Sequence, residues 1–112
     1  MKFQQWSLES TMAENAYGIP EPCGTPEIPL FDIDLVLMPL VGWDQFGARL
    51  GMGAGYYDRA LHPFANLDSP LRVGVAYQLQ RVPRLPAEPW DIHLHGVISD
   101  SGWFECPKPS EE

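Results

Sequence analysis

The chain has 112 residues, a formal net charge of −8 and 45% hydrophobic residues. This length fits a single domain, which we assign to residues 1–112, and the hydrophobic content argues against global disorder because it is sufficient for a core. The negative charge argues against nucleic acid or an anionic membrane as a partner, since both normally require a basic surface.

Cysteine usage and the start of the sequence bear on the cellular compartment. Cys23 and Cys106 have neither metal-motif spacing nor the density of a disulfide framework, so we expect two reduced thiols. The beginning of the sequence lacks the basic start and apolar core of a signal peptide, and no uninterrupted apolar run could span a membrane. We therefore expect a cytoplasmic protein, with residues 106–112 as a flexible tail.

The amino-terminal third gives weak structural signals. Residues 1–16 have irregularly spaced apolar positions, which are compatible with a short strand followed by a helix or a turn. Prolines and glycines concentrate in residues 18–30 and break regular structure there. We interpret this stretch as an irregular connector rather than a linker between domains, because it has no long flexible or charged character.

Stronger patterns follow in the rest of the chain. Leu35–Val41 is apolar throughout, which predicts a buried strand in a sheet that is covered on both faces. Tyr57–Leu61 predicts the start of a helix that Pro63 limits or deflects. Leu71–Tyr77 predicts a second buried strand, and Gly96–Ser99 predicts a short final one. The alternation of strands with short helical pieces favours an α/β fold.

A glycine-rich segment with charged residues, RLGMGAGYYDR, separates the first predicted strand from the helix. Its glycines let the backbone turn tightly and approach a ligand, and successive amide groups ahead of a helix can bind an anion. Two arginines add fixed cations, and one aspartate adds a hard oxygen that suits magnesium. The residues concerned are Arg49, Gly51, Gly53, Gly55, Asp58 and Arg59. Together they predict a site for nucleotide phosphates.

Local chemistry alone leaves other interpretations of this segment open. The spacing is neither the GxGxxG of dinucleotide-binding folds nor that of a P-loop, and glycine-rich turns are common. Asp58 is also compatible with an exposed carboxylate at a helix start, where the helix dipole favours it. Asp91 is equally compatible with the cap of a turn after Pro89 and Trp90.

The aromatic and histidine side chains near these motifs have structural alternatives as well. Tyr56 and Tyr57 are compatible with core packing, with one of them pointing inward even if the other meets a ligand. A metal site built on His62, His93 and His95 is disfavoured, because no cysteine or carboxylate set at metal spacing accompanies them.

Three blocks occur in a fixed order along the chain. The first is Gly18–Pro22 (GIPEP), the second runs from Asp34 to Arg59 and holds DLVLMPLV and RLGMGAGYYDR, and the third is Leu85–Asp91 (LPAEPWD), followed by Gly96–Ile98. In order and spacing, these blocks resemble the 5-formyltetrahydrofolate cyclo-ligase family, also called methenyltetrahydrofolate synthetases. The resemblance covers roughly residues 12–105 and is specific because it rests on several blocks rather than on one glycine loop.

The resemblance implies a fold and an activity. The fold is a three-layer α/β/α sandwich with a mostly parallel sheet. The activity is the ATP- and Mg²⁺-dependent conversion of 5-formyltetrahydrofolate to 5,10-methenyltetrahydrofolate, with release of ADP and phosphate. ATP and a small-molecule folate are then the partners, and neither nucleic acid nor a membrane is expected.

The resemblance also implies which residues form the site. ATP would be bound by Arg49, Leu50, Gly51, Met52, Gly53, Ala54, Gly55, Tyr56 and Tyr57. The folate would be bound by Met52, Gly53, Ala54, Gly55 and Tyr56. Magnesium would be held by Asp58 and Asp91.

The chain departs from the family in one major respect: nearly the first half of a family member, with basic residues that help to bind ATP, has no counterpart here. A fragment or mis-started reading frame, a decayed remnant, and a missing half supplied by another chain are all compatible with this departure. One alternative function is a non-catalytic remnant that binds nucleotide or folate. Another is a relative of sugar-phosphate isomerases or CoA-transferases with a similar layered fold, which the Trp90–Asp91 block disfavours.

Overall fold

The computed structural model describes residues 3–51, 55–88 and 91–107, and its contacts divide the chain into two compact units. The smaller unit comprises residues 1–33 and the larger one residues 34–112. Each unit has its own strands, and the assignment of residues 1–112 to one domain stays a prediction.

The smaller unit is built around a two-stranded antiparallel ribbon. It consists of β1 (Met12–Glu14) and β2 (Pro20–Pro22). Asn15 shapes the connection between them, because its side-chain oxygen accepts the N–H groups of Tyr17 and Ile19 at 2.8 and 3.1 Å. The predicted irregular connector thus contains a strand, followed by the 3₁₀ helix η1 (Leu30–Asp32). Prolines are tolerated in β2 because a two-stranded ribbon leaves one edge of each strand unpaired.

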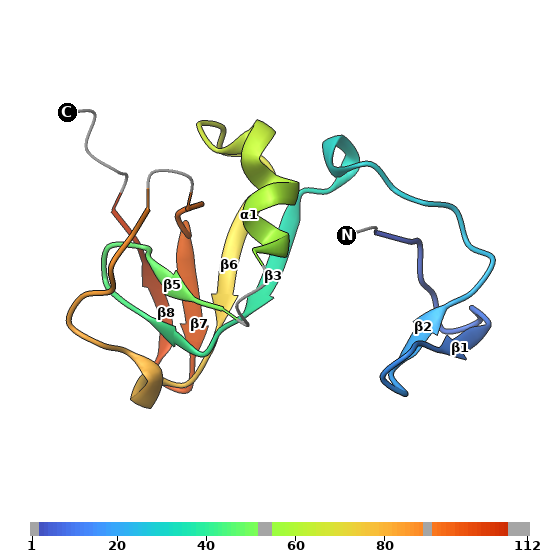
Figure 1. Ribbon diagram of the computed structural model, residues 1–112, viewed down its shortest axis with the longest axis horizontal. Helices are drawn as coiled ribbons and strands as arrows, with labels where there is room; N and C mark the ends of the chain where they lie inside the picture. Colours follow the sequence, from blue (N-terminus) through green and yellow to red (C-terminus); the bar gives the residue numbers. More distant parts are fainter. Residues whose placement is uncertain (1–2, 52–54, 89–90, 108–112) are drawn as a thin grey trace. The chain divides into compact units, whose positions relative to one another are not determined.

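The larger unit is organised by a four-stranded sheet in the order β3-β6-β7-β8 (Figure 1). Its strands are β3 (Leu35–Pro39), β6 (Leu71–Val75), β7 (Gly96–Ser99) and β8 (Gly102–Glu105). The first three run parallel and β8 is antiparallel to β7. This confirms the predicted α/β class with a mostly parallel sheet. The prediction that Gly96–Ser99 is the last strand is wrong, because Gly102, at φ +102°, closes a hairpin into β8.

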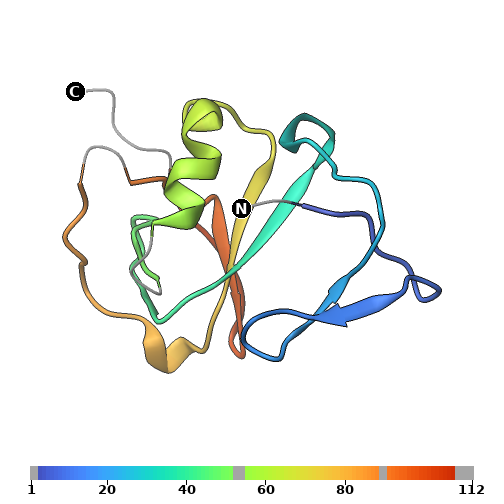
Figure 2. The ribbon, with the colours of Figure 1, turned by 45° about the vertical axis from the view of Figure 1, so that its right-hand side comes forward.

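One face of this sheet carries the helix and a small hairpin (Figures 1 and 2). The elements are α1 (Tyr56–Leu61), the 3₁₀ helix η2 (His62–Phe64) and the antiparallel pair β4 (Gly42–Trp43) and β5 (Arg49–Leu50). Pro63 lies in the first turn of η2, where its missing N–H costs no hydrogen bond. The proline therefore limits α1 as the sequence predicts. A further 3₁₀ helix, η3 (Gln78–Gln80), follows β6.

The core lies between this covered face and the elements above it. Its buried side chains include Val36, Met38, Trp43, Leu61, Phe64, Ile92, Leu94 and Val97. On the other face of β3, Leu35 and Leu37 are 46% and 52% exposed. Within the described residues only one face of β3 is covered, because its residues alternate between buried and exposed, and the expected cover on the second face stays a prediction.

The structure bears on three expectations, which concern the two cysteines, the flexible tail and membrane-spanning segments. Both cysteines are free; Cys23 is exposed, whereas Cys106 is buried, and burial and the nearby carboxylate of Asp44 raise the pKa of Cys106 to about 11. The N–H of Cys106 donates to the carbonyl oxygen of His95 at 2.9 Å, so this residue belongs to the folded part. Of the predicted tail, residues 108–112 lie outside the described residues. In the described ranges, every helix falls short of the length and apolarity needed to cross a membrane.

A glycine in β7 provides a test of this packing. A Cβ on Gly96 would lie 2.1 Å from the ring of Trp103 and 2.7 Å from the carbonyl oxygen of Phe104. We therefore expect Gly96→Ala to lower the free energy of unfolding by about 1–3 kcal/mol, the usual cost of overpacking. Gly42→Ala is the matched control, because its Cβ would meet its neighbours at 3.6 Å. Urea denaturation measures both, and an equal loss in the two variants would contradict this packing.

Candidate phosphate and magnesium site

A buried carboxylate shapes the turn that leads into the glycine-rich segment. Asp44 is 1% exposed. Its Oδ1 accepts the N–H groups of Phe46 and Ala48 at 2.9 and 3.1 Å, and its Oδ2 accepts the N–H of Leu85 at 2.7 Å. These bonds satisfy a carboxylate that would be costly to bury alone. They fix the turn between β4 and β5 and thereby place Arg49.

The same turn requires a glycine. Gly47 has a φ of +88°, and a Cβ on it would lie 2.9 Å from the carbonyl oxygen of Leu94. Its own carbonyl oxygen accepts the N–H of Leu94 at 2.9 Å, so the turn is held against the segment that precedes β7. Asp44 is not among the residues predicted for the site from the sequence. The signal that could identify it is an aspartate three residues before a glycine, which is typical of turns closed by the aspartate side chain.

Arg49 and Asp58 form the central contact of the site. The Nη2 of Arg49 lies 2.5 Å from the Oδ1 of Asp58, and the two side chains are only 10% and 17% exposed. The N–H of Ile92 donates to the same oxygen at 2.9 Å. Strand β5, helix α1 and the segment before β7 therefore meet at one carboxylate oxygen.

Both arginines of the glycine-rich segment lie beside one of its glycines. A Cβ on Gly51 would lie 3.7 Å from the Nη1 of Arg49, and a Cβ on Gly55 would lie 3.4 Å from the Nη1 of Arg59. Gly55 has a φ of +68°, a conformation that other residues rarely adopt. Each of the two guanidinium groups thus lies beside a described glycine of the segment.

The buried guanidinium of Arg49 retains capacity for an anion. Its Nη2 is used by Asp58, whereas its Nε is buried and has no hydrogen-bond partner among the described residues. Buried N–H groups normally find an acceptor, because leaving one unpaired costs free energy. A phosphate oxygen would supply that acceptor, and Arg presents several donors in one plane for such a group.

Part of the predicted binding set cannot be placed in this geometry. Met52, Gly53, Ala54 and the side chain of Tyr56 lie outside the described residues. Leu50 is 53% exposed and Tyr57 is half-buried. The predicted contacts of these residues with ATP or folate stay predictions.

Asp91 is hydrogen-bonded to Glu88, which agrees with the capping role that local chemistry left open for it. Its N–H donates to the carbonyl oxygen of Glu88 at 3.0 Å, and its Oδ2 accepts the N–H of Glu88 at 2.8 Å. Because Ile92 is bonded to Asp58, the structure also brings the Asp91 segment to α1. Within the described ranges, no group of three or more His, Cys, Asp or Glu could hold a metal ion. Two carboxylates are nevertheless compatible with Mg²⁺, which usually keeps waters and phosphate oxygens as its other ligands.

The histidines make contacts within the protein. The Nδ1 of His95 accepts the backbone N–H of Arg72 at 2.8 Å, which lengthens the pairing of β6 with the segment before β7. The Nδ1 of His93 is buried without a partner among the described residues, and His62 is exposed. The contact gives His95 a structural role, and no three of the described metal-ligating groups lie together.

Comparison with known proteins identifies the family that the sequence blocks resemble. The model of the 5-formyltetrahydrofolate cyclo-ligase family matches residues 1–100. The chain belongs to this family. The 5-formyltetrahydrofolate cyclo-ligase of Haemophilus influenzae is 41% identical over 98 residues, which cover 86% of this chain and 52% of the relative. That of Escherichia coli K12 is 42% identical over 105 residues, covering 92% and 57%.

Solved structures of family members resemble the chain in fold. The 5,10-methenyltetrahydrofolate synthetase of Aquifex aeolicus, determined by NMR, superposes with a TM-score of 0.72 at 33% identity and covers 95% of this chain and 52% of its own. The enzyme of Mycoplasma pneumoniae gives a TM-score of 0.59 at 32% identity, covering 78% and 52%. The chain thus spans about half the length of the relatives that it matches.

The role of Asp44 leads to a stability prediction. Asp44→Asn places an amide group opposite one of the N–H donors, so we expect a loss of about 1.5–3 kcal/mol in the free energy of unfolding, typical of a hydrogen bond to a charged group. Asp100→Asn is the matched control, because among the described residues the Oδ1 of Asp100 accepts a single N–H, that of Gln78, at an exposed position. Denaturant unfolding of both variants checks this expectation. An Asp44 variant as stable as the control would show that the turn does not depend on the carboxylate.

Proposed function

We propose that the chain supplies the phosphate and magnesium side of a 5-formyltetrahydrofolate cyclo-ligase. The reaction converts 5-formyltetrahydrofolate to 5,10-methenyltetrahydrofolate while ATP yields ADP and phosphate. The observation that carries the proposal is the junction at Asp58, where the buried guanidinium of Arg49 and the N–H of Ile92 share one oxygen beside Gly51. Membership of the cyclo-ligase family supports the same proposal.

ATP is needed because the formyl oxygen is a poor leaving group. In the proposed sequence, the formyl oxygen attacks the γ-phosphorus and ADP leaves. The second folate nitrogen then bonds to the formyl carbon and loses its proton to solvent, and the C–O bond breaks to release phosphate. In such a phosphoryl transfer the protein mainly positions the groups and neutralises charge.

Arg49 is suited to that task. Its buried Nε and its Nη1 beside Gly51 would donate to phosphate oxygens, whereas Nη2 stays on Asp58. A guanidinium held in place before the reaction stabilises developing charge without reorganisation. Arg59, beside Gly55, would add a second cation at the other end of the segment.

The carboxylates of Asp58 and Asp91 fit a magnesium ion. Oδ1 of Asp58 accepts both Arg49 and the N–H of Ile92, so the second oxygen of this carboxylate is the one that would hold the ion. Asp91, next to Ile92, would add an oxygen from the neighbouring segment. When bound, Mg²⁺ supplies positive charge to the phosphate oxygens. The bonds from Arg49 and Ile92 hold Asp58 in place for that role.

The three-layer α/β/α sandwich belongs to this proposal. The uncovered face of the sheet carries the apolar side chains of Leu37, Val75 and Ile98, which are 44–52% exposed. Contiguous apolar surface of this kind is normally covered by further structure. In the family relatives, about half of the length lies beyond the part that this chain matches, which supports a second layer of helices on this face.

A second candidate function is binding without turnover. It is favoured by the observation that the chain matches only 52–57% of its relatives' length, because other parts of the site could lie beyond the matched part. The chain would then bind ATP or folate as a small molecule without catalysing ring closure. The cytoplasmic location stays a prediction under both candidates.

Asp58 gives a test of the metal assignment. We expect Asp58→Asn to weaken binding of Mg-ATP by about tenfold or more, since even partners outside the metal's own ligands change metal affinity 10- to 100-fold. Binding of metal-free ATP should change much less, because removal of the carboxylate also releases Arg49 for the phosphates. Calorimetric titration with and without Mg²⁺ measures both affinities. Asp32→Asn, an exposed site with the same charge change, is the control. Equal losses in both titrations would assign Asp58 to a structural role.

The two candidate functions differ in whether the chain catalyses ring closure. We expect the 112-residue chain to turn over 5-formyltetrahydrofolate slowly or not at all, because misplacing reacting atoms by about 1 Å can cost roughly a hundredfold in rate. A chimera carrying the amino-terminal half of the Escherichia coli relative should be active. The absorbance rise of the methenyl product in the presence of ATP and Mg²⁺ measures both rates. Equal rates would show that the chain holds a complete site, and a chimera that binds ATP without turnover would favour the binding function.

A further inference from the structure

A buried arginine outside the predicted site connects two of the segments that build it. Arg72 lies in β6, next to Val36 of β3, and is 4% exposed. Its Nε donates to the carbonyl oxygen of His93 at 2.8 Å. This bond attaches the guanidinium to the segment that carries Asp91 and Ile92.

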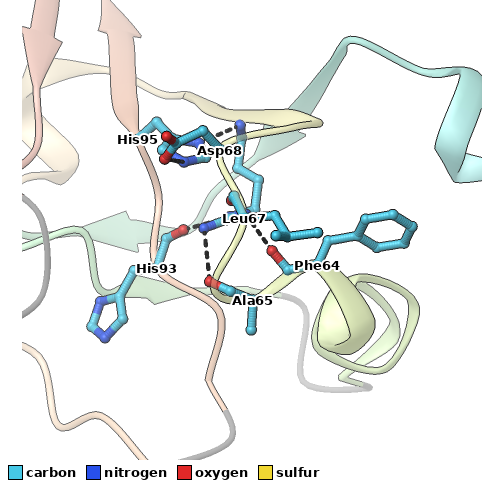
Figure 3. Close-up of polar contacts among 7 residues, drawn as sticks. Phe64, Ala65, Leu67, Asp68, His93 and His95 are labelled. Atoms are coloured by element: carbon cyan, nitrogen blue, oxygen red, sulfur yellow. Dashed lines mark hydrogen bonds and ion pairs between the residues drawn. The ribbon is translucent and has the colours of Figure 1, made fainter.

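The other donors of this guanidinium reach the end of the helical stretch. Nη1 donates to the carbonyl oxygens of Phe64 and Leu67 at 3.3 and 3.1 Å, and Nη2 donates to that of Ala65 at 3.5 Å. Figure 3 shows these carbonyl groups and that of His93 turned toward one point. Four carbonyl oxygens from two segments are therefore gathered by one side chain; we call this set the Arg72 cluster.

Formation of the Arg72 cluster costs free energy because it buries a charged group. It also depends on the several N–H donors of a guanidinium. Burial lowers the pKa of Arg72, and the charge of Asp68 opposes this effect. A buried guanidinium is tolerated when most of its N–H groups are satisfied, and its planar geometry serves several acceptors in fixed directions. An apolar side chain of similar size would fill the space but would leave the carbonyl groups unsatisfied, and lysine could serve only some of them.

The Arg72 cluster and the Asp58 junction both connect the same two segments, which are the stretch from α1 to residue 67 and the segment before β7. Helix α1 carries Asp58 and continues through η2 to the carbonyl groups that Arg72 binds. The segment before β7 is bound by Asp58 at Ile92 and by Arg72 at His93, one residue apart. Loss of the Arg72 cluster would let α1 and this segment shift relative to each other.

We propose that Arg72 is a positioning residue of the candidate site: by binding the 64–67 turn and His93 together, it sets the position of Asp58 relative to Asp91. This rests on the proposed function, in which these two carboxylates hold magnesium. Arg72 would then govern the affinity for Mg-ATP without touching the nucleotide.

Amide hydrogen exchange of the 112-residue chain tests the structural half of this proposal. The reporter is the N–H of Ile92, which donates to Asp58. The references are the N–H groups of Leu40 and Ala76, which donate to Val75 and Ile98 at the far end of β6. In Arg72→Met we expect exchange at Ile92 to accelerate about tenfold or more relative to the references, and in Arg72→Lys by less. Arg84→Met, which removes an exposed arginine that lies over the ring of Phe46, should leave the ratio unchanged.

A double-mutant cycle on Mg-ATP affinity tests the functional half. If Arg72 acts through Asp58, Arg72→Lys should weaken Mg-ATP binding several-fold in the wild-type background and have little effect in the Asp58→Asn background. Additive losses in the two backgrounds would overturn the positioning role, because a general loss of stability would act equally in both.

The outcomes separate the two proposals. A wild-type chain that does not bind Mg-ATP would contradict the proposed function, and the Ile92 exchange would then decide the positioning role alone. Acceleration that is equal at Ile92 and at the references would mark Arg72 as a general core residue and overturn the inference. If Arg72→Met does not fold, Arg72→Lys, which keeps the charge, provides the same comparison.

Discussion

One carboxylate oxygen joins the three segments of the candidate site. The Oδ1 of Asp58 receives Arg49 from β5 and the N–H of Ile92 from the segment before β7, while Asp58 itself stands on α1. None of these segments is long: α1 has six residues and β5 has two. Short elements have little intrinsic stability, so their mutual placement depends on such contacts. This junction therefore holds Arg49 and Asp58, which lie at the two ends of the glycine-rich segment in sequence.

Two buried charged side chains, one negative and one positive, hold the turns next to this junction. Asp44 accepts three backbone N–H groups, and the guanidinium of Arg72 donates to four backbone carbonyl groups. Both side chains therefore satisfy irregular backbone that no strand or helix would satisfy. Asp44 holds the turn before Arg49, whereas Arg72 holds the turn after α1. This division explains how a unit with one short α-helix among its described residues can fix loops around a polar site.

Much of the site's composition could be predicted, because its signals are local. Gly51, Gly55 and the arginines beside them follow each other closely in sequence, and the structure keeps each arginine next to a glycine. The contact between Arg49 and Asp58 spans nine positions and could not be read from spacing alone, because it depends on how β5 enters the segment and α1 leaves it. Asp44 and Arg72 escaped prediction for a related reason. A single charged residue in an apolar stretch does not reveal the backbone groups that it will bind.

The sequence by itself determined the α/β class, the main strands, the end of α1 before Pro63 and the family. These follow from hydrophobic runs, proline chemistry and ordered motifs, all of which act over short stretches of chain. Only the tertiary structure decided that β3 buries one face, that β8 closes the sheet as an antiparallel strand, and that Asp58, Ile92 and Arg49 meet. Burial and pairing of distant segments depend on which surfaces come into contact. An apolar run in the sequence does not reveal whether one or both faces of its strand are covered.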